Sequence, residues 1–325
     1  MKVSILVPVY GVEQVIETCA ESLFAQTYEQ LEYIFVDDCS PDRSIEVLQQ
    51  VLSRFPHRSR QVTILRHDVN RGLGAARLTA LMAATGDFVM HVDSDDWLAT
   101  DAVELLVNKQ QETDADIVDG GYVESYSDGA QRTVTPWHGS KGTYLKLLLA
   151  QNTLSHQIWA RLIRRSLHLD NHILPMEGVN QAEDYCVIPR IIWFARRTWI
   201  DQVVSYYRID QNGVFKDGIS PRHVDSLLKA NQTVADFIIQ HDTDHQYAWA
   251  TKVGLLKIYV QVVRAGIKPK QLGDRLPAFS QSKLLSAARC ILQLPFGDRL
   301  VRFMYLTLKG LLREKILHAS DQEER

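Results

Sequence analysis

The stretch Gly86-Asp-Phe-Val-Met-His-Val-Asp-Ser-Asp-Asp-Trp97 decides the fold, because a short apolar run ends there in a cluster of acids. The run at 88–92 lies between turn-type residues, which predicts a buried strand. Side chains two apart on an extended backbone point to the same side, so Asp93 and Asp95 can direct both carboxylates at one point. Such paired charges favour a bound cation, and hard oxygen ligands with open positions suit Mg²⁺ or Mn²⁺ with a diphosphate completing the shell. From this motif alone, capping of a helix that starts near Thr100 is the alternative.

Strand and helix patterns alternate through the first hundred residues. Apolar runs predict strands at 3–9, 32–36, 62–65 and 88–92, and helical spacing of apolar residues predicts helices at 12–23, 45–52 and 72–84. This alternation predicts an α/β fold with a mostly parallel central sheet flanked by helices, whose ligands bind beyond the carboxyl ends of the strands. The unusual polar residues at those ends are Tyr10, Asp37, Asp38, Asn70, Arg71, Asp93 and Asp95. Their collection at one edge predicts a binding site.

Composition narrows the class of protein. The chain has 325 residues and a formal net charge of −3, which gives no basis for nucleic-acid binding. The four cysteines are far apart and have no metal-ligand spacing, which predicts reduced thiols. The N-terminus shows no signal-peptide pattern, and no apolar stretch approaches the roughly 20 residues of a spanning helix. We therefore expect a cytoplasmic protein, either free or peripheral at the inner face of the cell membrane.

Two common nucleotide-binding motifs are missing. No G-x-G-x-x-G follows the first strand, and the sequence has no G-x-x-x-x-G-K-[ST] loop. Gly72-Leu-Gly74 comes instead after the third strand. We interpret these glycines as a tight helix start, with Arg77 facing back towards the site. A dehydrogenase or a P-loop nucleotide site is disfavoured.

The first hundred residues resemble the inverting family 2 glycosyltransferases, which have the GT-A fold. The matching segments, in order, are Val7-Pro-Val-Tyr10, Phe35-Val-Asp-Asp-Cys-Ser40, Asn70-Arg-Gly-Leu-Gly-Ala-Ala-Arg77 and Val92-Asp-Ser-Asp-Asp-Trp97. Gly11 departs from the usual Asn, which we expect to alter a turn without removing a catalytic group. The resemblance implies that Pro8 and Tyr10 flank the nucleobase and that Asp38 hydrogen-bonds it. It also implies that Asp93 contacts the ribose or the metal, while Asp95 ligates a Mg²⁺ or Mn²⁺ that bridges the donor diphosphate. The remaining candidates for donor binding are Asn70, Arg77 and Ser94.

A second acidic motif is Gln181-Ala-Glu-Asp-Tyr-Cys186. Glu183 and Asp184 open a predicted helix, where acids are favoured by the helix dipole. In the resembled family an acidic pair at this position carries the catalytic base. The resemblance therefore implies that Asp184 is the general base and Glu183 its supporting neighbour.

Residues 101–215 form the expected acceptor half of a GT-A domain at 1–215, with residues 1–100 as its donor half. Patterns predict a helix at 102–109, a hairpin arm at 129–136, and strands at 116–118, 122–127 and 198–207. Trp159 and Arg161 lie in a segment that resembles the family's W-x-K-L, and core packing is favoured over a sugar platform for Trp159. Asp210 stands where relatives have a metal-proximal His, and a turn is favoured over a metal ligand there.

Residues 216–325 form an expected helical C-terminal extension, with helices at 224–238, 249–263 and 300–317 and a disordered end at 320–325. The last helix is basic and amphipathic. It can lie on an anionic membrane, or pack on the catalytic domain or a second subunit, and packing is favoured over the membrane. A peripheral membrane contact or a homodimer would use residues 290–318.

These features predict a metal-dependent, hexosyltransferase-type enzyme. It would move a sugar from a nucleoside-diphosphate-sugar, UDP-linked, to a glycan or lipid-linked acceptor in cell-surface polysaccharide synthesis. The alternative is a non-catalytic nucleotide-sugar-binding or scaffold subunit of an envelope-glycan complex. A nucleotidyltransferase is disfavoured, because Tyr10-Gly-Val-Glu13 is not the glycine-rich basic loop that such an enzyme needs.

Overall fold

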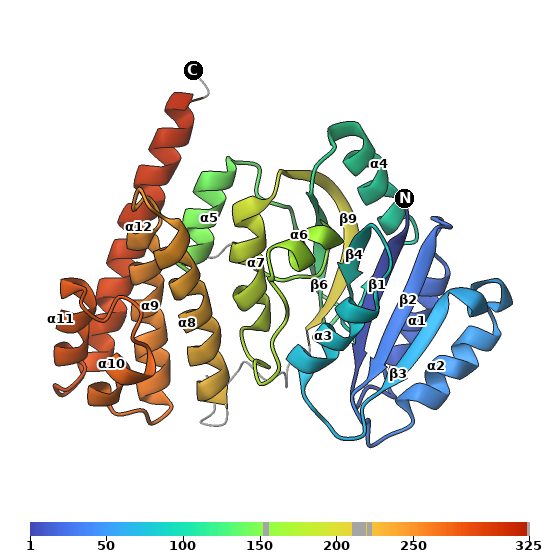
Figure 1. Cartoon of the computed structure of the whole chain (residues 1–325), viewed down its shortest axis with the longest axis horizontal. Helices are drawn as coiled ribbons and strands as arrows, with labels where there is room; N and C mark the ends of the chain where they lie inside the picture. Colours follow the sequence, from blue (N-terminus) through green and yellow to red (C-terminus); the bar gives the residue numbers. More distant parts are fainter. Residues whose placement is uncertain (152–155, 210–218, 220–222, 324–325) are drawn as a thin grey trace. The chain divides into compact units, whose positions relative to one another are not determined.

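The structure, a computed structural model, describes residues 1–151, 156–209, 219 and 223–323. The chain divides into two compact units (Figure 1). The first comprises Met1–Pro136, Gln157–Asn180 and Phe194–Gly213, and the second comprises Trp137–His156, Gln181–Trp193 and Val214–Arg325. Two segments of the expected acceptor half thus belong to the second unit, and a functional boundary at residue 215 stays a prediction.

One sheet organises the first unit. Its described strands are β1 (Val3–Val9), β2 (Leu31–Asp37), β3 (Val62–Arg66), β4 (Phe88–His91), β5 (Trp97–Leu98), β6 (Ile117–Tyr126), β7 (Gln131–Val134), β8 (Arg161–Arg164) and β9 (Arg197–Ile209). The strand order is β3-β2-β1-β4-β8-β6-β9-β5, with β7 paired to β6. The first four strands are parallel, as the alternation predicts. β8 runs antiparallel to both β4 and β6, and β9 runs parallel to β6.

Helices cover both faces of the parallel strands, so the fold is α/β as predicted. Buried apolar residues of α1 (Ile16–Phe24), α2 (Ser44–Ser53) and α4 (Ala102–Thr113) share one core with alternate residues of β1 and β2. α3 (Leu73–Ala83) also packs against β1 and β2, and the short α6 (Arg165–Asp170) follows β8. All seven residues of β1 are buried, which is typical of a parallel strand covered on both faces. Because β1 pairs parallel with both β2 and β4, the carboxyl ends of these three strands lie at one edge of the sheet.

The prediction of two separate strands at 116–118 and 122–127 is wrong. A single strand, β6, continues through Gly120 and Gly121, with register shifts against β9. A Cβ at Gly120 would lie 2.3 Å from Cγ2 of Val204, so the glycine makes room for the Val204 side chain of β9. β7 pairs antiparallel with β6, which confirms the hairpin arm.

A buried ion-pair cluster joins the sheet strands in the second half of this unit. The carboxylate of Asp119 on β6 accepts hydrogen bonds from Nη1 of Arg161 at 2.7 Å and from Nε of Arg197 at 2.5 Å. Paired in this way, Arg161 holds β8 to β6 at the position where the resembled family has a lysine.

Helices form the described part of the second unit. They are α5 (Lys141–Leu149), α7 (Glu183–Phe194, whose last residue belongs to the first unit), α8 (Val224–His241), α9 (Ala248–Arg264), α10 (Leu272–Arg275), α11 (Lys283–Ile291) and α12 (Gly297–Glu323). α9 is the central helix, because α5, α8, α11 and α12 all pack against it. The predicted helices of this region are therefore confirmed.

The predicted disorder from Ser320 is wrong up to Glu323, where α12 ends. The polar residues at the end of α12 extend a helix that is already nucleated. Each residue added to such a helix gains one backbone hydrogen bond. No described helix is long and apolar enough to cross a membrane. All four cysteines are free, as the sequence predicts.

Candidate active site

The acidic cluster lies in the turn between β4 and β5. The backbone N–H of Asp96 donates to the carbonyl oxygen of Asp93 at 3.1 Å, which closes this turn. Arg77 of α3 is 2% exposed, and its Nη2 donates to Oδ1 of Asp93 at 2.7 Å. This ion pair confirms that Arg77 faces back towards the cluster. Ser94 is buried within the same turn.

The electrostatics of the cluster favour a cation. Asp95 is exposed as a whole residue, yet the protein around its carboxyl displaces solvent and, together with the charge of Asp93, raises its pKa. Burial raises the pKa of Asp96 well above its usual value, and the charges of Asp95 and Asp93 add to this effect. Oδ2 of Asp96 is buried and has no hydrogen-bond partner within the part of the chain that the structure describes. A positive charge beside these carboxylates would offset both effects.

Arg208 of β9 is a site residue whose role the sequence did not reveal. Its backbone N–H donates to Oδ1 of Asp96 at 2.8 Å, and its Nε donates to the carbonyl oxygen of Asp95 at 3.1 Å. The guanidinium lies 5.2 Å from the ring centroid of Trp97, which stacks on Tyr206 at 5.3 Å. Arg208 thus holds the acidic turn from β9, the strand that pairs with β5. Asp210 lies outside the described residues.

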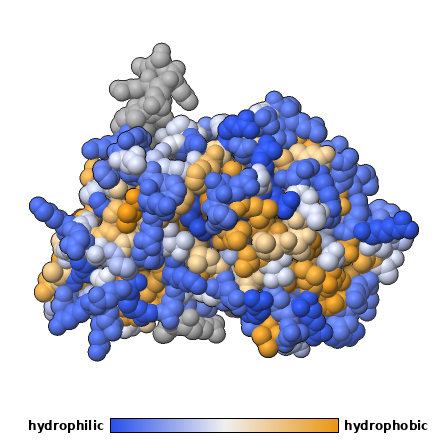
Figure 2. Space-filling model, viewed as in Figure 1, coloured by the Kyte–Doolittle hydropathy of each residue, from blue (hydrophilic) through white to orange (hydrophobic). Residues whose placement is uncertain are grey.

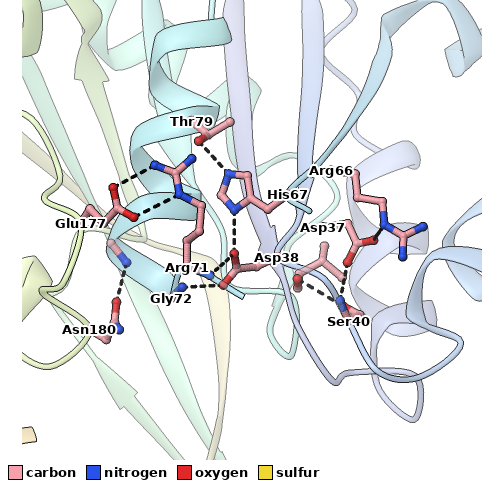
Figure 3. A network of polar contacts seen from close by, with 12 residues as sticks. Asp37, Asp38, Ser40, Arg66, His67, Arg71, Gly72, Thr79, Glu177 and Asn180 are labelled. Carbon is pink, nitrogen blue, oxygen red and sulfur yellow. Dashed lines mark hydrogen bonds and ion pairs between the residues drawn. The ribbon is translucent and has the colours of Figure 1, made fainter. Parts of the chain in front are cut away.

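Asp38 lies at the centre of a second network (Figure 3). It is 3% exposed, and its Oδ1 lies 2.6 Å from Nδ1 of His67. The backbone N–H groups of Arg71 and Gly72 donate to its Oδ1 at 2.9 Å and its Oδ2 at 2.7 Å. Nε2 of His67 lies 2.9 Å from the hydroxyl of Thr79. Asp38 therefore holds the start of α3 in place, and His67 orients Asp38.

The neighbouring Asp37 has a different surrounding. It accepts a hydrogen bond from the backbone N–H of Ser40 at 2.8 Å and pairs with Arg66 at 3.3 Å (Figure 3). Successive side chains of a strand point to opposite sides, so only one of the two acids can face α3.

Residues 177–180 pack directly on the start of α3. Arg71 pairs with Glu177 at 2.8 Å, and the backbone N–H of Gly74 donates to Oδ1 of Asn180 at 3.1 Å (Figure 3). A Cβ at Gly72 would lie 2.2 Å from Nδ2 of Asn180, and one at Gly74 would lie 2.2 Å from the carbonyl oxygen of Met176. The glycines of this motif therefore admit the 176–180 segment, besides starting the helix.

The remaining donor-site candidates lie at the same edge of the sheet. Pro8 is buried in β1, whereas Tyr10 and Asn70 are exposed. Gly11 has a φ of +66°, in the left-handed region that Gly and Asn tolerate best. Gly11 therefore has a backbone conformation that the family's Asn could also adopt, and an altered turn stays a prediction.

Glu183 and Asp184 form the first turn of α7, as predicted. The residue before them, Ala182, has a φ of +62°, which costs about 1–2 kcal/mol for a residue with a Cβ. The backbone N–H of Gln181 donates to Oγ of Ser226 at 2.8 Å, which anchors the start of α7 to α8. These acids belong to the second unit. That they lie close to the acidic cluster of the first unit stays a prediction.

Trp159 is a core residue, which confirms the favoured interpretation. It is 8% exposed, stacks on Tyr207 at 5.1 Å and meets the edge of Tyr122 at 4.8 Å.

Among the described residues, no three His, Cys, Asp or Glu side chains are gathered as they would be around a metal ion. Asp93 and Asp95 remain the pair proposed for a metal.

Comparison with known proteins identifies the family. The family "Glycosyl transferase family 2" matches residues 4–170, about half of the chain. The uncharacterized glycosyltransferase EpsJ of Bacillus subtilis is 30% identical over 244 residues, which cover 72% of this chain and 69% of EpsJ. A poly(ribitol-phosphate) beta-glucosyltransferase of Bacillus spizizenii is 37% identical over 123 residues, covering 37% of this chain and 19% of that protein. The chain belongs to glycosyl transferase family 2.

The fold matches a solved structure over nearly its full length. The crystal structure of Staphylococcus aureus TarS residues 1–349 in complex with UDP superposes with a TM-score of 0.69 at 19% identity. The match covers 97% of this chain and 92% of the TarS chain. The fold is of the GT-A type, as the motifs predict.

Proposed function

We propose that this glycosyltransferase inverts the anomeric centre as it moves a sugar from a UDP-sugar to a hydroxyl group of a glycan or lipid-linked acceptor. The observation that carries the proposal is the double role of α3. The carboxylate of Asp38 accepts a hydrogen bond from the backbone N–H of Gly72, the residue before the helix, and Arg77 within the helix pairs with Asp93. One helix therefore connects Asp38, the residue proposed to bind the nucleobase, with Asp93, which is proposed to lie near the diphosphate, at a single edge of the sheet.

The donor site would use the base contact of Asp38. A carboxylate has about four acceptor positions, and three are filled by His67, Arg71 and Gly72. Counting the contacts of the described residues, one acceptor position is left for an N–H of uracil. Pro8 and Tyr10 would flank the base, with Asn70 and Ser94 completing the pocket. The UDP in the TarS complex supports this choice of nucleotide.

Asp95 and Asp93 would hold a divalent cation, Mg²⁺ or Mn²⁺, against the diphosphate. The donor set fits, because carboxylate oxygens are the ligands these ions prefer, and because burial and then the charge of Asp93 raise the pKa of Asp95, which a cation would offset. Such an ion neutralises negative charge on the departing diphosphate. Arg77 and Arg208 would keep the acidic turn in place while the donor enters.

The transfer itself needs a proton acceptor. The acceptor oxygen attacks the anomeric carbon as the bond from that carbon to the diphosphate oxygen breaks, and Asp184 takes the hydroxyl proton. Glu183 supports Asp184 from the same helical turn. Single displacement of this kind requires no enzymic nucleophile and inverts the anomeric centre.

The acceptor class is proposed from the relatives. One of them is by name a poly(ribitol-phosphate) glucosyltransferase, which supports a role in cell-surface polysaccharide synthesis. A cytoplasmic site of action agrees with the nucleotide-sugar donor.

A nucleotide-sugar screen tests this function. The full chain is incubated with UDP-, GDP- and dTDP-sugars, with Mn²⁺ or with EDTA, and the release of nucleoside diphosphate is measured. We expect release from a UDP-sugar only with the metal. Metal-dependent UDP binding without release or transfer would instead support the non-catalytic subunit.

A further inference from the structure

The helix α12 and the residues just before it expose several large apolar side chains. In residues 294–311, six large hydrophobic residues are exposed: Leu294, Phe296, Leu300, Phe303, Leu306 and Leu311. Phe296 and Phe303 are 68% and 69% exposed. Figure 2 shows hydrophobic beside hydrophilic surface at the left-hand edge, where α11 and α12 lie. Large apolar side chains exposed together on one segment indicate an interaction site.

The exposed face is held outward by the opposite face of the helix. Val301 and Tyr305 are buried, and the hydroxyl of Tyr305 donates to the carbonyl oxygen of Gln151 at 2.8 Å. Leu300 and Phe303 are three apart and so lie on one face, turned away from Val301 and Tyr305. Since this anchoring holds the helix by its buried side, the apolar stripe stays exposed.

Positive charge borders the stripe. Arg299, Arg302, Arg313 and Lys315 are all exposed. From Leu294 to Lys315 the chain has five basic residues and two acids, whereas its formal net charge is −3 overall. One of the two acids, Asp298, is paired with Arg264 at 2.7 Å. The segment is therefore a basic, apolar surface on an acidic protein.

This combination distinguishes between two occupants. A second copy docking symmetrically would place this net-positive face against itself, which opposes like charges. An anionic lipid surface satisfies both features, because the apolar side chains enter the headgroup boundary and the cations meet the phosphates.

We propose that this face of α12 docks the protein on an anionic membrane surface. Phe296, Leu300 and Phe303 supply the apolar contact, and Arg302 and Arg313 supply the charge. The inference is independent of the sugar that the enzyme transfers, since it rests on the second unit alone.

Vesicle flotation of the full chain tests the proposal. Vesicles contain phosphatidylcholine alone, or equal parts of phosphatidylcholine and phosphatidylglycerol. We expect binding to the anionic vesicles that weakens with added salt. Arg302→Gln and Arg313→Gln should each weaken it about fivefold, and Phe303→Ser about tenfold or more. Met82→Ser, at an exposed apolar residue of α3, is the matched control and should bind as the wild type does.

Three results would overturn the proposal. The first is no binding to anionic vesicles. The second is equal loss for Met82→Ser and Phe303→Ser. The third is a concentration-dependent dimer in sedimentation velocity that Phe303→Ser dissociates, which would assign the face to a second copy. Circular dichroism shows whether each variant is folded, and nucleotide-sugar turnover, measured separately, reports on the proposed function.

Discussion

Nδ1 of His67 lies 2.6 Å from Oδ1 of Asp38, and its other ring nitrogen lies 2.9 Å from the hydroxyl of Thr79. In the tautomer with its proton on Nδ1, the ring donates to Asp38 and accepts from the hydroxyl of Thr79. A hydrogen bond to a charged group contributes about 1.5–3 kcal/mol. We thus expect His67→Ala to weaken UDP binding about tenfold or more and to lower the midpoint of thermal unfolding. Calorimetry and a thermal melt measure both effects.

The matched variant is His67→Asn, whose side-chain amide can donate to Asp38 in place of the ring. It should restore part of the UDP affinity. Unchanged affinity in His67→Ala would show that the orientation of Asp38 does not matter for the donor.

Gly74 should not tolerate a side chain. A Cβ there would lie 2.2 Å from the carbonyl oxygen of Met176 and 2.5 Å from that of Val179. Gly74→Ala should therefore destabilise the protein by about 1–3 kcal/mol in urea unfolding. Gly310→Ala is the control, since a Cβ at Gly310 in α12 meets nothing within 4 Å. It should be neutral or stabilise by up to about 1 kcal/mol. Equal effects of the two would contradict the packing described for the 176–180 segment.

Glu32 should make stability depend on acidic pH. Burial raises the pKa of Glu32, but hydrogen bonds from Lys2, Ser4 and Thr85 outweigh it and lower the pKa to about 2. A carboxyl with a lowered folded-state pKa stabilises the fold above its ordinary pKa and loses this contribution as pH falls through the folded value. The free energy of unfolding should thus fall between about pH 4.5 and 2, and less so in Glu32→Gln. Identical pH profiles for Glu32→Gln and the wild type would rule this out, with the exposed Glu46→Gln as control.

The carboxylate of Asp95 should lower the stability of the metal-free protein while being required for transfer. Burial and the charge of Asp93 raise its pKa, so its charged form disfavours the folded state at neutral pH. Asp95→Asn should raise the thermal midpoint of the metal-free protein. It should also remove the stabilisation by Mn²⁺ with UDP and lower transfer at least about 100-fold. Metal-dependent stabilisation that persists in Asp95→Asn would place the metal elsewhere.

Local sequence patterns predict much of the fold. The strand ends are readable because Asp38 and Asp93 each follow an apolar run, and parallel strands bring such ends together. β6 was misread because Gly120 and Gly121 are typical of a turn, whereas here they allow close strand packing. The end of α12 was misread because its residues are polar.

Long-range contacts could not be read from the sequence. Arg71 and Glu177 are 106 positions apart, and nothing in either local pattern predicts their pairing. Arg208 is 112 positions from Asp96, and its contact uses the backbone N–H, which any residue except proline supplies. His67 lies just before the Asn70–Arg77 motif, and no sequence pattern around it predicts its contact with Asp38. Only the topology of the sheet brings these groups together.

We propose that an acid in the first turn of α7, Asp184, removes the proton from the acceptor hydroxyl. The most direct test is turnover of Asp184→Asn with a UDP-sugar and acceptor, alongside calorimetry with UDP and Mn²⁺. Glu183→Gln, one position earlier, is the matched control and should retain more activity. We predict that kcat of Asp184→Asn falls about 10²–10⁴-fold while UDP binds as in the wild type. Full turnover by Asp184→Asn would contradict the account.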